Sequence, residues 1–302
     1  MIISASRRTD IPAYYTRWFM NRLRAGFCDV PNPVNPRQVS RVSLRPADVD
    51  AIVFWTRDAR PLMGSLAELD QCGYRYLFLV TVLDYPAPLR ARDLPVAEAV
   101  PMFRRLADRL GPERVVWRYD PLVFSNVTNG AFHAARFAAL AGALHGYTRR
   151  VITSGLSLYR KNLQRLEALS QQGLTVIPKE QVPAAEMHAL LRRMVASAHE
   201  HGMELVSCAE TLDWQSCGIA PGRCIDDALI ARALGIRVTG AKDPGQRPAC
   251  GCVVSRDIGS YDTCVRGCPY CYAVADPDKA RLSLAQHDPQ APSLVPLPAP
   301  RP

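Results

Sequence analysis

Short, almost uninterrupted apolar runs alternate along this chain with longer segments whose apolar residues recur every three or four positions. The runs predict β-strands, and because they are apolar at successive positions they are typical of a parallel sheet covered on both faces. We expect seven such strands, at residues 2–6, 51–56, 76–82, 115–120, 151–155, 204–209 and 253–258.

The longer segments predict amphipathic helices that would cover this sheet. They lie at residues 16–24, 96–110, 129–146, 161–171, 184–201 and 273–285. Alternation of strands and helices over about six to eight units indicates an α/β fold, a TIM-like parallel βα barrel that is either full or partial. We expect residues 1–285 to form this barrel as a single domain, and the proline-rich residues 286–302 to form an extended or disordered tail.

Polar residues follow several of the predicted strands. In a parallel barrel the carboxyl ends of the strands meet at one rim, where the active site lies. Thr and Ser at such positions also cap the following helix, which is the simpler explanation for Thr153 and Ser154. Arginine does not cap helices, so Arg7, Arg8 and Arg118 are candidates for binding an anionic group of a substrate or cofactor. The other candidates at strand ends are Asp10, Thr81, Asp84 and Asp120.

Composition adds little to this picture. Hydrophobic residues make up 48% of the 302 positions and charged residues 22%, which is ordinary for a globular enzyme. The net charge of +9 suggests an anionic partner such as nucleic acid, although the arginines are dispersed rather than gathered in one block. Because the start of the chain lacks a secretory pattern and no apolar run approaches the ~20 residues of a membrane span, we expect a cytoplasmic protein without a membrane partner.

Cysteine is concentrated near the C-terminal end, where eight of the ten cysteines lie between Cys208 and Cys271. The last three, Cys264, Cys268 and Cys271, have the spacing C-x3-C-x2-C. Three thiolates this close in sequence can bind one [4Fe–4S] cluster and leave its fourth iron without a protein ligand. A structural zinc site is the alternative, because Zn²⁺ also takes thiolates.

This cysteine run, with Tyr270 directly before the last cysteine, resembles the signature of the radical S-adenosylmethionine (SAM) superfamily, and in particular its spore photoproduct lyase branch. The resemblance implies that SAM binds the open iron and is cleaved reductively to a 5′-deoxyadenosyl radical. It also implies an electron donor such as flavodoxin or ferredoxin, and a place for Tyr270 beside the adenine of SAM. In the photoproduct branch the substrate is nucleic acid, whose lesion would have to be extruded from the duplex.

The motif lies near the end of this chain, whereas in the superfamily it follows the first strand of the barrel. We therefore expect a circularly permuted radical SAM barrel, in which residues 253–258 supply the first strand and residues 2–6 the second. The termini of a nearly closed barrel lie close together, which makes such a permutation physically easy. By this resemblance Arg7, Arg8 and Asp10 would face the amino group of SAM, while Thr81 and Asp84 would lie near its ribose.

A second group of cysteines precedes the first, and we expect four of them to hold another metal. The four are Cys208, Cys224, Cys250 and Cys252, and the metal would be a second [4Fe–4S] cluster or a zinc ion. The simpler alternative is that these are buried apolar thiols. Cys217 is left over, and near the rim it could donate a hydrogen atom to a substrate radical.

Several short motifs together resemble the DUF1848 family over nearly the whole chain: Ile2–Ala13, Phe54–Arg57, Trp117–Pro121, Cys250–Cys252 and the final cysteine run. The family brings no activity with it, so two hypotheses rest on the site. One is a radical SAM enzyme acting on an unknown, anionic or nucleic-acid substrate, with Arg118, Asp120 and Cys217 as candidate catalytic residues. The other is a non-catalytic binding protein stabilised by zinc or iron–sulfur sites.

Overall fold

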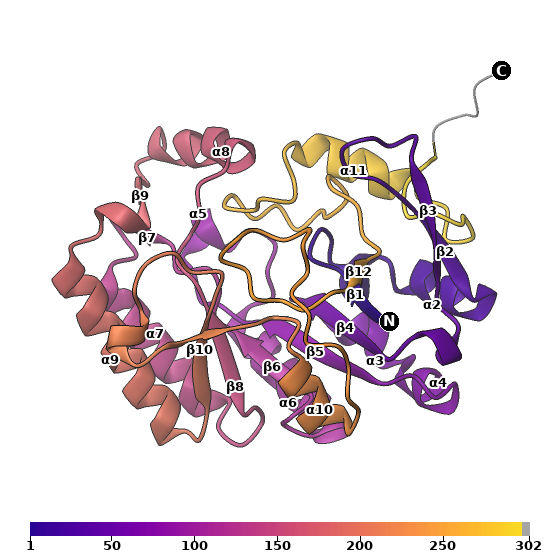
Figure 1. Cartoon of the computed structure of the whole chain (residues 1–302). Helices are drawn as coiled ribbons and strands as arrows, with labels where there is room; N and C mark the ends of the chain where they lie inside the picture. The colour runs from indigo at the N-terminus through magenta and orange to yellow at the C-terminus, as the bar shows by residue number, and fades with distance from the viewer. Residues whose placement is uncertain (298–302) are drawn as a thin grey trace.

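The computed structural model describes residues 1–297, and its centre is one sheet of eight strands (Figure 1). Every neighbouring pair in the sheet is parallel, in the order β11-β10-β8-β6-β5-β4-β1-β12. The last strand of the chain therefore pairs with the first. The strands are β1 Ile2–Ala5, β4 Ala51–Thr56, β5 Tyr76–Thr81, β6 Val115–Arg118, β8 Arg150–Thr153, β10 Glu204–Cys208, β11 Ala220–Gly222 and β12 Arg256–Asp257.

Helices connect most of these strands, and two small antiparallel strand pairs lie outside the sheet. The helices are α1 Ile11–Tyr14, α2 Thr16–Ala25, α3 Arg60–Met63, α4 Leu66–Gln71, α5 Ala87–Arg90, α6 Val96–Leu110, α7 Gly130–Ala143, α8 Arg160–Ser170, α9 Ala184–Glu200, α10 Asp227–Leu234 and α11 Pro277–Ala285. Three 3₁₀ turns lie at Pro46–Asp48, Lys179–Gln181 and Gln215–Cys217. β2 Phe27–Pro31 and β3 Val39–Ser43 form a hairpin, and β7 Phe124–Ser125 pairs with the distant β9 Val176–Ile177.

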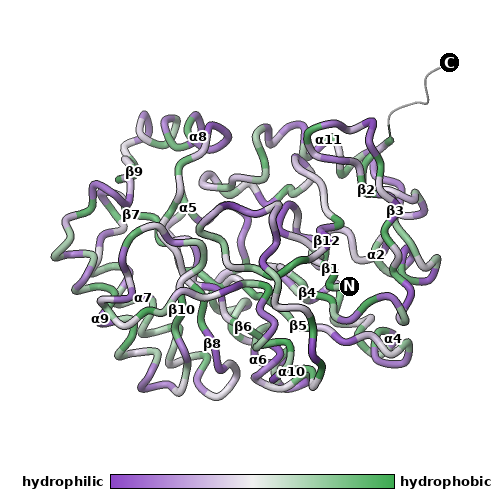
Figure 2. The backbone as a smooth tube through the Cα atoms, viewed as in Figure 1, coloured by the Kyte–Doolittle hydropathy of each residue, from purple (hydrophilic) through white to green (hydrophobic). Residues whose placement is uncertain are grey.

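The two faces of the sheet pack against different partners, which explains why its strands are apolar at successive positions. Along β4, Ile52 and Phe54 lie in a core shared with α1, α2, α6, α7 and α9. Val53 and Trp55 lie in a second core, shared with α10 and the cysteine-containing segments around it. Figure 2 shows these hydrophobic runs in the middle of the molecule, in the strands. A strand buried on both faces cannot show the alternation of a half-exposed strand.

The segment between β11 and β12 covers the second face, and in Figure 1 it crosses in front of the strands. Its helix α10 buries Leu229 and Ile230 against the sheet. The backbone amide of Val253 donates to the carbonyl of Ile225 at 3.1 Å, which joins the chain that leaves β11 to the chain that enters β12. The two edge strands of the sheet are thus connected through loops.

The predicted α/β architecture with a large parallel sheet is confirmed, and six strands and all six predicted helices lie within a few residues of their expected positions. The seventh strand, expected over residues 253–258, is reduced to the two residues of β12. β11 was not expected, because its sequence Ala-Pro-Gly has no strand pattern. No helix in residues 1–297 is both long and apolar enough to cross a membrane.

The expected tail packs against α2 over part of its length. Trp18 Nε1 donates to the carbonyl of Ala291 at 3.0 Å, and Asn21 Nδ2 donates to the carbonyl of Pro289 at 2.9 Å. Leu294 is buried. Residues 298–302 of the predicted tail lie outside the described part of the chain.

Candidate functional site

Two adjoining cavities lie at the carboxyl ends of the parallel strands, with volumes of about 350 and about 170 Å³. The smaller cavity is lined by Cys264, Cys268 and Cys271, and the larger by the four upstream cysteines Cys208, Cys224, Cys250 and Cys252. The residues that line both cavities are Arg7, Arg8, Trp55, Arg118, Asp120, Tyr270 and Tyr272. The structure thus brings together most of the residues predicted for the site, because parallel strands end at the same edge.

The loop that carries Cys264, Cys268 and Cys271 is held by its backbone carbonyls. On α8, Asn162 Nδ2 donates to the carbonyl of Tyr270 at 3.1 Å, and Arg165 donates to the carbonyls of Pro269 and Cys271. From the other side, the Tyr15 hydroxyl donates to the carbonyl of Thr263 at 2.7 Å. These contacts fix the shape of the loop without using its sulfur atoms.

The sulfur atoms of this loop have different surroundings. The amide of Ala273 donates to Cys271 Sγ at 3.3 Å, a contact of the kind that tunes iron–sulfur centres. Burial raises the pKa of the Cys264 thiol to about 12. The thiol therefore stays protonated near neutral pH until a metal displaces its proton.

A buried chain of alternating charges surrounds the same loop. Arg266, which lies between the first two cysteines, donates from Nη2 to Asp10 Oδ2 at 3.1 Å, and its Nε lies 3.8 Å from Asp93 Oδ1. Asp93 also pairs with Arg57, whose Nη2 donates to the Tyr270 hydroxyl at 3.2 Å. The chain links the cysteine loop to the ends of β1 and β4, and its charges balance.

Asp10 was predicted to face SAM, but its carboxylate is already fully used by the protein. Besides Arg266, it accepts hydrogen bonds from Thr56 Oγ1 at 2.7 Å, from the amide of Arg57 at 3.0 Å and from the amide of Ala13 at 3.1 Å. Asp10 therefore positions the turn after β1 and the start of α1.

The junction of β1 with β12 brings Arg7 to the cavities. Asp257 accepts hydrogen bonds from Ser4 Oγ at 3.0 Å, from Ser6 Oγ at 2.6 Å and from the Arg7 amide at 2.8 Å. Glycine is required just beyond, because a Cβ on Gly259 would lie 2.1 Å from Ser6 Oγ. The chain can then turn from β12 into the cysteine loop directly over the end of β1.

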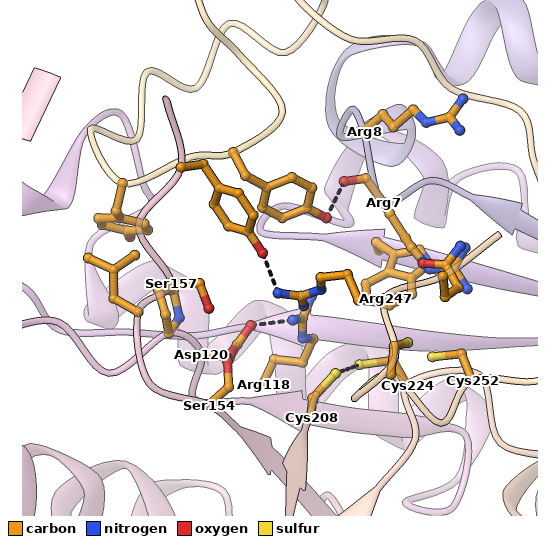
Figure 3. Close-up of a pocket in the computed structure, with 18 of the residues that line it drawn as sticks. Arg7, Arg8, Arg118, Asp120, Ser154, Ser157, Cys208, Cys224, Arg247 and Cys252 are labelled. Carbon is orange, nitrogen blue, oxygen red and sulfur yellow. Dashed lines mark hydrogen bonds and ion pairs between the residues drawn. The ribbon is translucent and has the colours of Figure 1, made fainter. Parts of the chain in front are cut away.

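Guanidinium groups dominate the shared wall of the two cavities. Those of Arg7 and Arg118 lie over the Trp55 ring, at 5.6 and 4.8 Å from its centroid. Arg118 pairs with Asp120, which also accepts from Ser154 Oγ (Figure 3). Within residues 1–297, Arg118 Nε has no hydrogen-bond partner although it is buried. A donor is therefore left for a ligand in the cavity.

The upstream cysteines lie along one side of the larger cavity, next to Arg118 (Figure 3). Cys208 Sγ is 2.9 Å from Cys224 Sγ, and the amide of Ile225 donates to Cys252 Sγ at 3.4 Å. Hydrogen bonds from the thiols of Cys224 and Cys250 lower the pKa of Cys252. Cys208 and Cys224 are thus in direct contact, and Cys250 and Cys252 line the same cavity.

Two predicted residues lie away from both cavities. Asp84 turns toward α7, where it pairs with Arg136 at 2.9 Å, so it does not approach the position expected for a ribose. Cys217 is buried in the core on the helical side of the sheet, which removes it as a hydrogen-atom donor at the rim. Thr81, in contrast, lines the smaller cavity as expected.

Several aromatic and basic residues of the site were not predicted. Trp55 is the last but one residue of a predicted strand, and strand alternation places it on the same face as Val53. Tyr272 directly follows the last cysteine, and its hydroxyl donates to the carbonyl of Arg7 at 2.8 Å. Arg247 donates to the Tyr159 hydroxyl, and both side chains line the larger cavity. These two residues come from loops without a sequence pattern.

Comparison with known proteins identifies a family but no activity. The family model described as "Domain of unknown function (DUF1848)" matches residues 2–273. No curated protein matches the chain. A solved D-hydantoinase from a Bacillus sp. AR9 is 12% identical over 55% of this chain and 36% of its own, with a TM-score of 0.28, which is too low to support any inference. With nearly its full length matched, the chain belongs to the DUF1848 family.

Proposed function

We propose that this protein is a radical SAM enzyme. The observation that supports the proposal is that Cys264, Cys268 and Cys271 line one cavity together with the turn after β1 and the ends of β4, β5 and β6. A triplet that served only to stabilise a peripheral loop would have no reason to open toward the carboxyl ends of a parallel sheet, where α/β enzymes bind their ligands.

The strand order supports the permuted form of the barrel. β12 lies parallel to β1, with Ile3 opposite Arg256 and Ser4 opposite Asp257, and the cysteine loop follows β12 directly. If β12 is counted first, the strands run across the sheet in consecutive order, β12, β1, β4, β5, β6, β8, β10 and β11. The arrangement matches a partial barrel whose first strand–loop unit has moved to the end of the chain.

The residues around the triplet fit a [4Fe–4S] cluster. The loop is held by its carbonyls, the three thiols share one cavity, and Arg57 and Arg266 lie close enough to offset the negative charge of a thiolate-bound cluster. When bound, this cluster would supply the electron for reductive cleavage of SAM to the 5′-deoxyadenosyl radical. We propose a flavodoxin or ferredoxin as the donor of that electron.

Residues of the chain would bind and orient SAM. Thr9 lines the smaller cavity, and its Oγ1 is buried without a hydrogen-bond partner in residues 1–297, which leaves it to accept from the amino group. Arg8 and Arg118 offer guanidinium donors for the carboxylate. Tyr270 is buried between the two cavities and its hydroxyl is fixed by Arg57, which suits it to pack against the adenine.

We propose that the larger cavity holds an anionic substrate. Arg7, Arg8, Arg118 and Arg247 line it against two carboxylates, Asp120 and Asp257, both of which already have partners. A volume of about 350 Å³ suits one small molecule or a single extruded nucleotide rather than a duplex. Asp120 stays a candidate catalytic residue because it faces this cavity with Arg118.

The test is the formation of 5′-deoxyadenosine by anaerobically reconstituted, dithionite-reduced protein. Cys268→Ala should abolish it, because one of the three cluster ligands is lost. Cys217→Ser is the matched control, since Cys217 is buried outside both cavities and should leave product formation unchanged. Equal product from Cys268→Ala and wild type would overturn the role of the triplet, and no product from wild type would favour a metal-stabilised binding protein instead.

A further inference from the structure

Four thiols come from β10 and from the segments that leave β11 and enter β12, the two edge strands of the sheet. Cys208 ends β10, and Cys224 follows β11 by two residues. Cys250 and Cys252 lie in the segment that leads into β12, at the opposite edge. All but Cys208 are buried, and all four line the larger cavity. Three separate segments of the chain thus contribute sulfur to one small volume.

The spacing of the sulfur atoms distinguishes between metal centres. A tetrahedral ion with metal–sulfur bonds of about 2.3 Å holds its thiolates about 3.8 Å apart. A [4Fe–4S] cube holds them farther apart, because each thiolate binds a different iron. The 2.9 Å contact between Cys208 and Cys224 is far from the spacing of a cube, and a single ion requires it to open by only about 1 Å.

We propose that Cys208, Cys224, Cys250 and Cys252 bind one tetrahedral metal ion, with Zn²⁺ as the ion that suits four thiolates best. As the side chains of residues 1–297 stand, no group of three or more His, Cys, Asp or Glu is arranged so that it could hold a metal ion. Binding one here would require Cys208 and Cys224 to move apart from their 2.9 Å contact.

The charges around the four thiols support an anionic centre. Zn²⁺ with four thiolates carries a net charge of −2, and Arg7 and Arg118 lie beside these thiols. The amide of Ile225 also donates to Cys252 Sγ at 3.4 Å, a contact that favours the thiolate form. Two cations and an oriented amide therefore face the site before any metal is bound.

The ion would close the sheet where strand pairing does not. In residues 1–297 no strand ladder joins β11 to β12, and β11 itself is three residues long and contains Pro221, which lacks an amide donor. A Cβ on Gly222 would lie 2.5 Å from Val206, so β11 already packs as tightly on β10 as it can. A metal bound to both edges would fix one wall of the larger cavity.

The experiment uses the full chain with Cys264, Cys268 and Cys271 all changed to Ala, so that its result does not depend on the proposed enzyme activity. Zinc, iron and acid-labile sulfide are measured, and zinc-edge X-ray absorption gives the ligands. We expect about one zinc per chain, bound by four sulfur atoms at about 2.3 Å, and no sulfide.

Removal of one ligand tests the assignment of the four residues. Cys252→Ser in the same background should lose the metal, whereas Cys217→Ser should keep it. If Cys252→Ser does not fold, the absorption spectrum of the parent variant still decides the question. Equimolar iron and sulfide, a metal-free folded protein, a zinc site containing nitrogen or oxygen, or a Cys208–Cys224 disulfide would each overturn the proposal.

Discussion

Arg266 offers a sharp test of how the cysteine loop is held. Its guanidinium lies between the carboxylates of Asp10 and Asp93, and the side chains of Arg266 and Asp10 are only 5% and 8% exposed. In Arg266→Met, Asp10 would keep hydrogen bonds only from uncharged donors, so a buried carboxylate would lose its counter-charge. Breaking a buried pair in this way costs about 3–5 kcal/mol of unfolding free energy.

Urea unfolding of the metal-free protein, followed by circular dichroism and tryptophan fluorescence, measures this loss. Arg281→Met is the matched control, because Arg281 and its partner Asp278 are 51% and 83% exposed and such a pair contributes about 0–1 kcal/mol. Because Arg266 lies between two of the proposed cluster ligands, its variant should also bind less iron on reconstitution. A loss for Arg266→Met no larger than that of Arg281→Met would refute the role of the buried charge chain.

Two further predictions concern stability. Gly259→Ala places a methyl group 2.1 Å from Ser6 Oγ and should lower the unfolding free energy, measured with urea, by about 1–3 kcal/mol. Gly64→Ala is the control and should lower it by nothing, because no atom lies within 4 Å of the added methyl group; equal losses would show that the β1–β12 junction adjusts to the methyl group at no cost. Burial lowers the pKa of His133 from 6.5 to about 4, so only the unfolded chain binds a proton between these pH values and stability falls as the pH falls. Between pH 6.5 and 4 the unfolding free energy of the wild type should therefore fall by up to about 3 kcal/mol more than that of His133→Gln. Parallel pH profiles of the two unfolding free energies would contradict this.

The parts of the fold that could be predicted from the sequence are the strands and helices whose buried residues form a regular apolar pattern. The strand β4 is apolar at every position from Ala51 to Trp55 because both faces are covered, and this pattern is visible without the structure. β3 was missed because three of its five residues are exposed. β11 was missed because Ala-Pro-Gly has no strand pattern, and it pairs with β10 only because the fold places it there. α10 was missed within the long segment between two cysteine groups.

The site was predictable where its residues followed strands or shared a motif. Arg7, Arg118 and the cysteines satisfied one of these conditions, and the structure places them around adjoining cavities. Asp93 satisfied neither condition. Arg266 lies within the cysteine motif, but its pairing with Asp93 depends on loops that meet only in three dimensions. Cys217 shows the opposite failure, since its proximity in sequence to other cysteines says nothing about which side of the sheet its loop packs on.

The measurement that tests the central claim most directly is electron paramagnetic resonance of the dithionite-reduced cluster, recorded with and without SAM on anaerobically reconstituted protein. The account predicts a reduced [4Fe–4S] signal that changes when SAM is added, because one iron has no protein ligand and can bind it. A signal indifferent to SAM, or a cysteine triplet that takes up zinc in place of iron, would contradict the account.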